Sequence, residues 1–237
     1  MEDARTQNGN STSNARASKI VPSQSLILGL GLVLLAGCAP IILIGKMFFG
    51  DPTVSGAFQH ATGVDLTEGK HKVLVLCSAP SMVDEGDLSL NYEIVEDVSR
   101  RLKREGIQLI ESNDVRTWMD DNGGHLDDPR DLAEEFDVDF IIYIALARVT
   151  FHEENSPSLY RGQAGGEVFA YEVKKTKGEV LVNEVFSKGF GSTYPDFHPV
   201  SADQIDSPRI FQKRFLDRIS AQLAHLFYKH KVSEEIR

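Results

Sequence analysis

Cysteine is scarce in this sequence, with two residues among 237, so a disulfide framework of the kind that staples small exported domains is excluded. Cys38 lies in a long uncharged stretch, and Cys77 ends an apolar run that predicts a core strand. The fold must therefore be held together by a hydrophobic core. Because no local Cys-His signature accompanies Cys77, we interpret it as a small buried side chain rather than a nucleophile.

Positive charge is also in short supply, because 25 Lys and Arg residues face 35 Asp and Glu residues, for a formal net charge of −10. Only four basic and two acidic residues precede Asp51, so the remainder carries a formal charge of −12. Binding of phosphate backbones requires clustered Lys and Arg, and anionic lipid attracts basic surfaces. We therefore expect no nucleic-acid partner and no flat adsorption onto anionic lipid.

Catalytic motifs are missing as well: the sequence has no Gly-x-Ser-x-Gly elbow, no phosphate-binding loop and no His-Glu-x-x-His pair. His152 and Glu153 come nearest to a metal cluster, but neighbouring residues of a strand point to opposite faces and do not share a ligand easily. The acidic run 120–128 lacks the alternate spacing of a calcium loop. We predict a protein that is not an enzyme and has neither cofactor nor metal.

What the sequence does have is an uncharged stretch from Leu26 to Ile44, long enough as a helix to span roughly 30 Å, the thickness of a bilayer's hydrocarbon core. Residues 26–45 therefore predict a transmembrane or lipoprotein signal segment. Residues 35–38, Leu-Ala-Gly-Cys, match a bacterial lipobox, in which Cys38 would take the lipid. The apolar character continues past Cys38, however, and this favours an uncleaved anchor. Both alternatives stay open.

The rest of the chain is placed outside the cytoplasm by either alternative, because basic residues precede the apolar stretch and favour a cytoplasmic amino terminus. Residues 1–25 are poor in large apolar side chains and are predicted to be disordered, as a cytoplasmic or signal n-region. Residues 46–70, punctuated by glycine and proline, are predicted to be a tether. Residues 71–230 are predicted to form a single exported α/β domain.

The hydrophobic patterns of this domain predict alternating strands and helices. Residues 73–77 are continuously apolar and predict a buried parallel strand, and a helix with a periodic apolar face follows and ends at Gly106. Asp128 with Pro129, and Ser207 with Pro208, predict helix starts. Further strands are predicted at 107–110, 139–151, 168–173 and 180–190, with loops at 152–165 and 191–207. The fold class is α/β, a mixed sheet of about five strands including a C-terminal hairpin and flanked by helices.

In this order the motifs resemble a group of envelope lipoprotein domains. The strand 73–77, the helix ending at Gly106, the sequence 131–139 leading into an apolar strand, and the hairpin with Gly178-Glu179-Val180-Leu181 carry the resemblance. They are similar to the curli-secretion lipoprotein, the TolB amino-terminal domain and the penicillin-binding-protein activator lipoproteins, over roughly residues 72–190. The resemblance implies a non-enzymatic, membrane-tethered domain that assembles or recruits envelope partners.

Three hypotheses for function follow from the sequence. The first is a non-enzymatic module on the outer side of the cytoplasmic membrane, which recruits an envelope protein partner or forms a homo-oligomer. The alternative is an exported hydrolase that uses Asp84, Glu85 and Asp87 in the loop after the first strand, where open α/β sheets place ligands. A plain structural envelope protein is the third.

Overall fold

The computed structural model describes residues 52–78, 90–123, 126 and 128–235. These residues belong to the second of two units into which the chain divides, residues 51–237. The apolar stretch Leu26–Ile44 lies outside the described residues. Within the part that is described, no helix is both long and apolar enough to cross a membrane.

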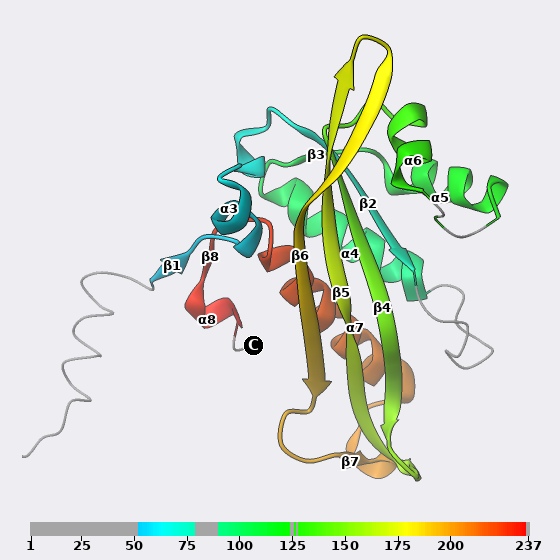
Figure 1. Ribbon diagram of the computed structural model, residues 1–237. Coiled ribbons are helices and arrows are strands. Elements are labelled where there is room, and N and C mark those ends of the chain that lie inside the picture. Colours follow the sequence, from blue (N-terminus) through cyan, green and yellow to red (C-terminus); the bar gives the residue numbers. More distant parts are fainter. Residues whose placement is uncertain (1–51, 79–89, 124–125, 127, 236–237) are drawn as a thin grey trace, which may run out of the picture. The chain divides into compact units, whose positions relative to one another are not determined.

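A mixed six-stranded sheet forms the centre of the fold (Figure 1), in the order β3-β2-β4-β5-β6, with β7 paired to β5. The pairs β3-β2 and β2-β4 are parallel, and the others are antiparallel. This confirms the predicted fold class. The strands are β2 (Lys72–Ser78), β3 (Gln108–Leu109), β4 (Phe140–Glu153), β5 (Ser156–Thr176), β6 (Glu179–Tyr194) and β7 (Val200–Ser201).

Helices cover both faces of the parallel part of the sheet. Because Val73, Leu74, Val75 and Leu76 alternate between those faces, all four are buried. One face packs on α3 (Ala57–Thr62), α4 (Leu90–Arg104) and α7 (Pro208–His225), and the other on α5 (Ser112–Asp121) and α6 (Pro129–Glu135). The remaining elements are β1 (Thr53–Val54), η1 (Leu66–Glu68), η2 (Ala202–Gln204), β8 (His230–Lys231) and α8 (Val232–Glu235).

The predicted helix boundaries at three positions are confirmed. The Asp128 side chain accepts a hydrogen bond from the Arg130 backbone N–H, with Pro129 in the first turn of α6. Ser207 caps α7 in the same way, by accepting from the backbone N–H of Ile210. Gly106 follows α4 with φ of +86°, a left-handed conformation that costs glycine little.

The loop predicted at 152–165 is wrong, because these residues complete β4 and begin the 21-residue β5. The connection is a tight turn at Glu154 and Asn155, where Asn155 takes a positive φ of 59°. The glycines that suggest a loop serve close packing instead. A Cβ on Gly162 would lie 2.5 Å from the buried ring of Phe215, and one on Gly166 would lie 2.2 Å from a backbone oxygen of β4. The sheet is therefore longer than the sequence pattern predicts.

The described part of the segment assigned to a tether, residues 52–70, contributes to the core. Within it, α3 and η1 bury Phe58 and Leu66 completely. The Phe58 ring lies 5.6 Å from Phe140, 5.9 Å from Phe186 and 5.6 Å from Phe227, measured between centroids. The folded part of the chain thus begins before residue 71, where the sequence pattern placed its boundary.

Backbone hydrogen bonds also connect the two ends of this domain. The Phe58 N–H donates to the Leu226 carbonyl at 2.9 Å, and β1 pairs with β8 through Thr53 and Val54. Residues before the first core strand are thereby fixed to residues that follow the last long helix.

Candidate functional site

Most of the residues to which the sequence assigns a chemical role lie outside the described part of the chain. This holds for the lipidation candidate Cys38 and for Asp84, Glu85 and Asp87, so their predicted roles stay predictions. Ser78, the last described residue before that acidic loop, shares a hydrogen bond of 2.7 Å between its hydroxyl and that of Tyr143.

The acidic and histidine side chains that the sequence brings near one another have separate structural partners. Glu153 accepts a hydrogen bond from Arg161 at 3.2 Å, whereas the His152 ring lies 4.6 Å from the Tyr160 ring. Among the described residues, no group of three or more His, Cys, Asp or Glu side chains could hold a metal ion. Cys77 is buried, and burial raises the pKa of its thiol, which leaves it protonated and unreactive at neutral pH.

The outer edge of β6 is the most extensive unpaired backbone surface that the structure describes. All sixteen residues of β6 belong to a strand that pairs with β5 alone, and no other described strand lies beside it. The opposite edge of the sheet is the two-residue β3. Long edge strands are usually blunted by proline, by repeated charges or by a β-bulge. The first half of β6 has two glutamates and a register shift at Val185, whereas residues 187–194 have no proline, no shift and Lys188 as the one charged residue. This second half of the edge is therefore a ready template for another strand.

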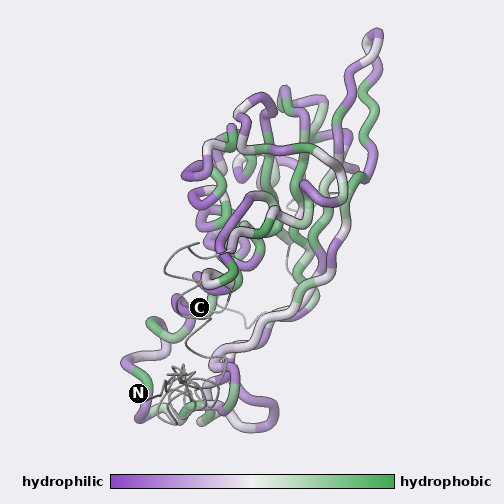
Figure 2. Tube along the Cα trace, turned by 90° about the vertical axis from the view of Figure 1, so that its left-hand side faces the viewer, coloured by the Kyte–Doolittle hydropathy of each residue, from purple (hydrophilic) through white to green (hydrophobic). Residues whose placement is uncertain are grey.

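The β5-β6 hairpin extends beyond the neighbouring strands at one end of the sheet (Figure 1), with hydrophilic residues at its tip (Figure 2). The turn at Lys177 and Gly178 has positive φ at both residues, as tight hairpin turns require. Two residues before this turn, Lys175 donates to Asp137 at 2.9 Å, and Lys72 donates to the same carboxylate at 3.4 Å; these bonds lower the pKa of Asp137. These exposed ion pairs link the hairpin to β2, and exposed pairs of this kind contribute little stability.

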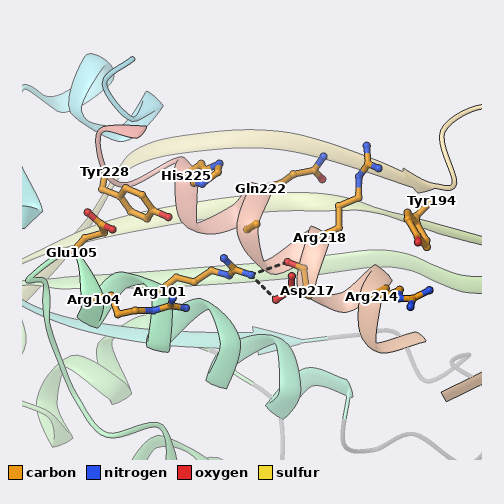
Figure 3. Close-up of a pocket in the computed structure, with 11 residues that line it drawn as sticks. Arg101, Arg104, Glu105, Tyr194, Arg214, Asp217, Arg218, Gln222, His225 and Tyr228 are labelled. Carbon is orange, nitrogen blue, oxygen red and sulfur yellow. Dashed lines mark hydrogen bonds and ion pairs between the residues drawn. The ribbon is translucent and has the colours of Figure 1, made fainter. Parts of the chain in front are cut away.

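A second candidate surface is a groove of about 490 Å³ between α4 and α7, which we call the α4-α7 groove (Figure 3). This volume is within the usual range for ligand sites. Its charged lining comprises four arginines and two acidic residues, so it has the opposite formal sign to the domain as a whole. These side chains are Arg101, Arg104, Glu105, Arg214, Asp217 and Arg218.

Ion pairs across and beside the groove fix most of its arginines. Arg101 donates from Nη2 to the Asp217 carboxylate at 2.5 Å, and Figure 3 shows its side chain reaching from α4 toward α7. Arg218 makes a two-pronged contact with Asp196, with distances of 3.0 and 2.6 Å. Arg214 donates to a further aspartate at 2.7 Å. These arginines are therefore held in position before any ligand arrives.

Sequence reasoning missed this groove. Basic residues near the end of a helix, such as those of α4, are usually explained by solvent exposure and by the helix dipole. Arg101 and Asp217 are 116 residues apart, and no local pattern links them. A regular spacing of arginines on α7, at 214 and 218, is the one signal in the sequence that points to a basic helix face.

Comparison with known proteins finds no matching family model and no significantly similar curated sequence. Among solved structures, the chain is similar to lipoprotein GNA1162 from Neisseria meningitidis, with 15% identity, 63% of this chain and 97% of that chain covered, and a TM-score of 0.35. It is also similar to the PelC dodecamer from Paraburkholderia phytofirmans, with 9% identity, 75% and 96% coverage, and a TM-score of 0.36. A third similar structure is hypothetical protein CT253 from Chlamydia trachomatis, with 15% identity, 66% of this chain and 96% of that chain covered, and a TM-score of 0.38.

Proposed function

We propose that this protein is a membrane-anchored envelope protein whose α/β domain recruits a protein partner by taking a strand of that partner onto the edge of β6. The observation that carries the proposal is the sixteen-residue edge strand, which pairs on one side only among the described residues. Unpaired N–H and C=O groups of an edge strand bind an extended segment through main-chain hydrogen bonds, while side chains of alternate residues give specificity.

Anchoring rests on the sequence. The stretch Leu26–Ile44 is long enough to cross a bilayer or to serve as a lipoprotein signal, and either role leaves residues 51–237 outside the cytoplasm. Intact mass of the membrane-extracted protein separates the two roles. A chain that retains Met1 is an uncleaved anchor, whereas loss of residues 1–37 with added acyl mass establishes lipidation at Cys38. A chain recovered without detergent, with neither feature, would contradict anchoring altogether.

The partner-recruiting role is tested by a pair of proline substitutions in β6, Ser187→Pro and Lys188→Pro. Neighbouring residues of a strand direct their N–H groups to opposite edges, so one variant removes a hydrogen bond to β5 and the other removes only a donor at the outer edge. Both residues are exposed. The Ser187 hydroxyl donates to Glu167 at 2.8 Å, so Ser187→Ala is the control for loss of that bond. The variant that removes the hydrogen bond to β5 should lower the Tm. The variant that removes only the donor at the outer edge should keep the wild-type Tm.

Partner binding is then measured by native mass spectrometry of the full-length protein, purified in detergent from its own membranes. We expect the variant with the unchanged Tm to lose the bound partner, whether that is an envelope protein or a second copy of this chain. If that variant retains the partner in the wild-type proportion, the edge of β6 is not the recruiting surface.

A further inference from the structure

A second binding surface, independent of the β6 edge, is the α4-α7 groove. We propose that this groove binds an acidic peptide segment of a partner protein, and that Arg104 receives a carboxylate of that segment. The charge of the groove as a whole is balanced. Its lining side chains sum to a formal charge of +2, and the carboxylates of Asp206 and Asp196, which pair with Arg214 and Arg218, bring that sum to zero. An acidic segment is therefore favoured by one particular cation of the groove rather than by its overall charge.

Arg104 is the arginine of the groove that remains available. Its Nε donates to the Arg100 carbonyl of its own helix at 3.4 Å, and no carboxylate among the described residues pairs with it. Both Nη groups are left for a ligand, in the fork geometry that suits a carboxylate. Figure 3 shows Arg104 beside Arg101 on α4. Asp217 is engaged by Arg101, so Arg104 has no carboxylate of its own among the described residues, and a ligand carboxylate would supply one.

The position of Arg104 also suits an extended ligand. It lines both the α4-α7 groove and a neighbouring groove between α4 and α5, of about 680 Å³, in which Arg100, Lys103 and Arg116 lie. These three side chains pair with Asp97, Glu111 and Asp120. The position of Arg104 therefore gives an extended peptide a path from one hollow into the next, with Arg104 between them as a cation that no described carboxylate pairs with.

Two observations favour a peptide over an anionic lipid surface. The basic side chains line hollows rather than a flat or convex face, and a bilayer cannot enter a hollow of this size. In addition, the large apolar side chains that are exposed in the described part of the chain are all absent from the lining, whereas membrane-docking surfaces pair basic residues with exposed apolar ones. Those exposed side chains are Val54, Leu181, Phe197 and Ile210.

The test uses the full-length protein in non-ionic detergent micelles and measures binding of fluorescently labelled tetraglutamate amide. Tetraglutamine amide is the uncharged control peptide, and glycerol 3-phosphate, a soluble analogue of an anionic lipid headgroup, is the lipid probe. Arg104→Gln is the test variant. Arg209→Gln is its matched control, because Arg209 is an exposed arginine of α7 that does not line the groove.

We expect tetraglutamate to bind the wild-type protein, to weaken with added salt, and to bind Arg104→Gln roughly ten- to a hundredfold more weakly, as loss of a charge-assisted hydrogen bond implies. Arg209→Gln should bind as the wild type does, and both variants should keep the wild-type Tm because both side chains are exposed. Equal binding by the two variants, equal binding of tetraglutamine, or binding of glycerol 3-phosphate without peptide binding would each overturn the proposal. The β6 proline variant that keeps its Tm should bind tetraglutamate normally, so failure of one proposal is distinguishable from failure of the other.

Discussion

Replacement of Phe58 by alanine is the most direct test of whether the residues before the first core strand belong to the folded domain. The side chain is 0% exposed and packs against the rings of Phe140, Phe186 and Phe227. Truncation of a fully buried phenylalanine costs about 3–5 kcal/mol, which includes the cavity left behind. Ring pairs of this kind contribute beyond their buried area, so the upper part of that range is expected.

Urea and thermal unfolding of the full-length protein, followed by circular dichroism, measure this loss. For a domain of this size, about 3–5 kcal/mol corresponds to a fall in Tm of roughly 6–20 °C. Phe197→Ala is the matched control, because the same ring is removed from a side chain that is 85% exposed. We expect that variant to stay within about 0.5 kcal/mol of the wild type. If both variants unfold alike, α3 is not part of the core and the reasoning is refuted.

Three further predictions concern backbone packing, pH and thiol reactivity. Gly166→Ala should destabilise by about 1–3 kcal/mol in urea unfolding because its Cβ would meet β4 backbone, whereas Gly191→Ala, with nothing within 4 Å, should be neutral or slightly stabilising; equal effects would contradict the packing argument. The hydroxyl of Thr67 donates to Asp65 and lowers the pKa of its carboxyl group from the ordinary 3.8. Asp65→Ala should therefore lower the free energy of unfolding by about 0.5–2 kcal/mol at neutral pH. This difference should be complete above about pH 4 and vanish as the pH falls through the lowered pKa, and a difference that persists in acid would be inconsistent. Cys77 should resist a thiol reagent until urea unfolds the protein, and rapid labelling of the native protein would show that it is not buried.

Local patterns in the sequence were sufficient for much of the fold. Continuous apolar residues at 73–77 identify a strand with two covered faces, and that strand is β2. The Asp-Pro and Ser-Pro pairs identify the starts of α6 and α7, because capping depends on residues next to each other in the chain. The order of strands and helices from residue 72 onward follows from these signals.

Non-local packing decided the features that the sequence did not reveal. In the sequence, Gly162 suggests a loop. In the structure it lies within a strand, where the ring of Phe215 occupies the space that a Cβ at this position would need. The helix of Phe58 spans six residues, too few to give a periodic pattern. The α4-α7 groove depends on two helices that are far apart in the chain, and the free edge of β6 depends on which strands pair. The spacing of arginines 214 and 218 is therefore the one sequence signal for either surface, and it does not reveal the helix opposite.

The connection of residues 53–58 to residues 226–231 has a consequence for the timing of folding. During synthesis the amino-terminal partners of these contacts emerge first, but α3 has no Leu226 carbonyl to bind, and β1 no β8, until nearly the whole chain has been made. The contiguous meander β4-β5-β6 has only short separations to close and can form early. The Phe58 ring can meet Phe140 and Phe186 once β4 and β6 have been made, but its contact with Phe227 must wait for the residues that follow α7. A chain interrupted before α7 would therefore leave that ring only partly covered, and exposed apolar surface of this kind is what chaperones and proteases recognise.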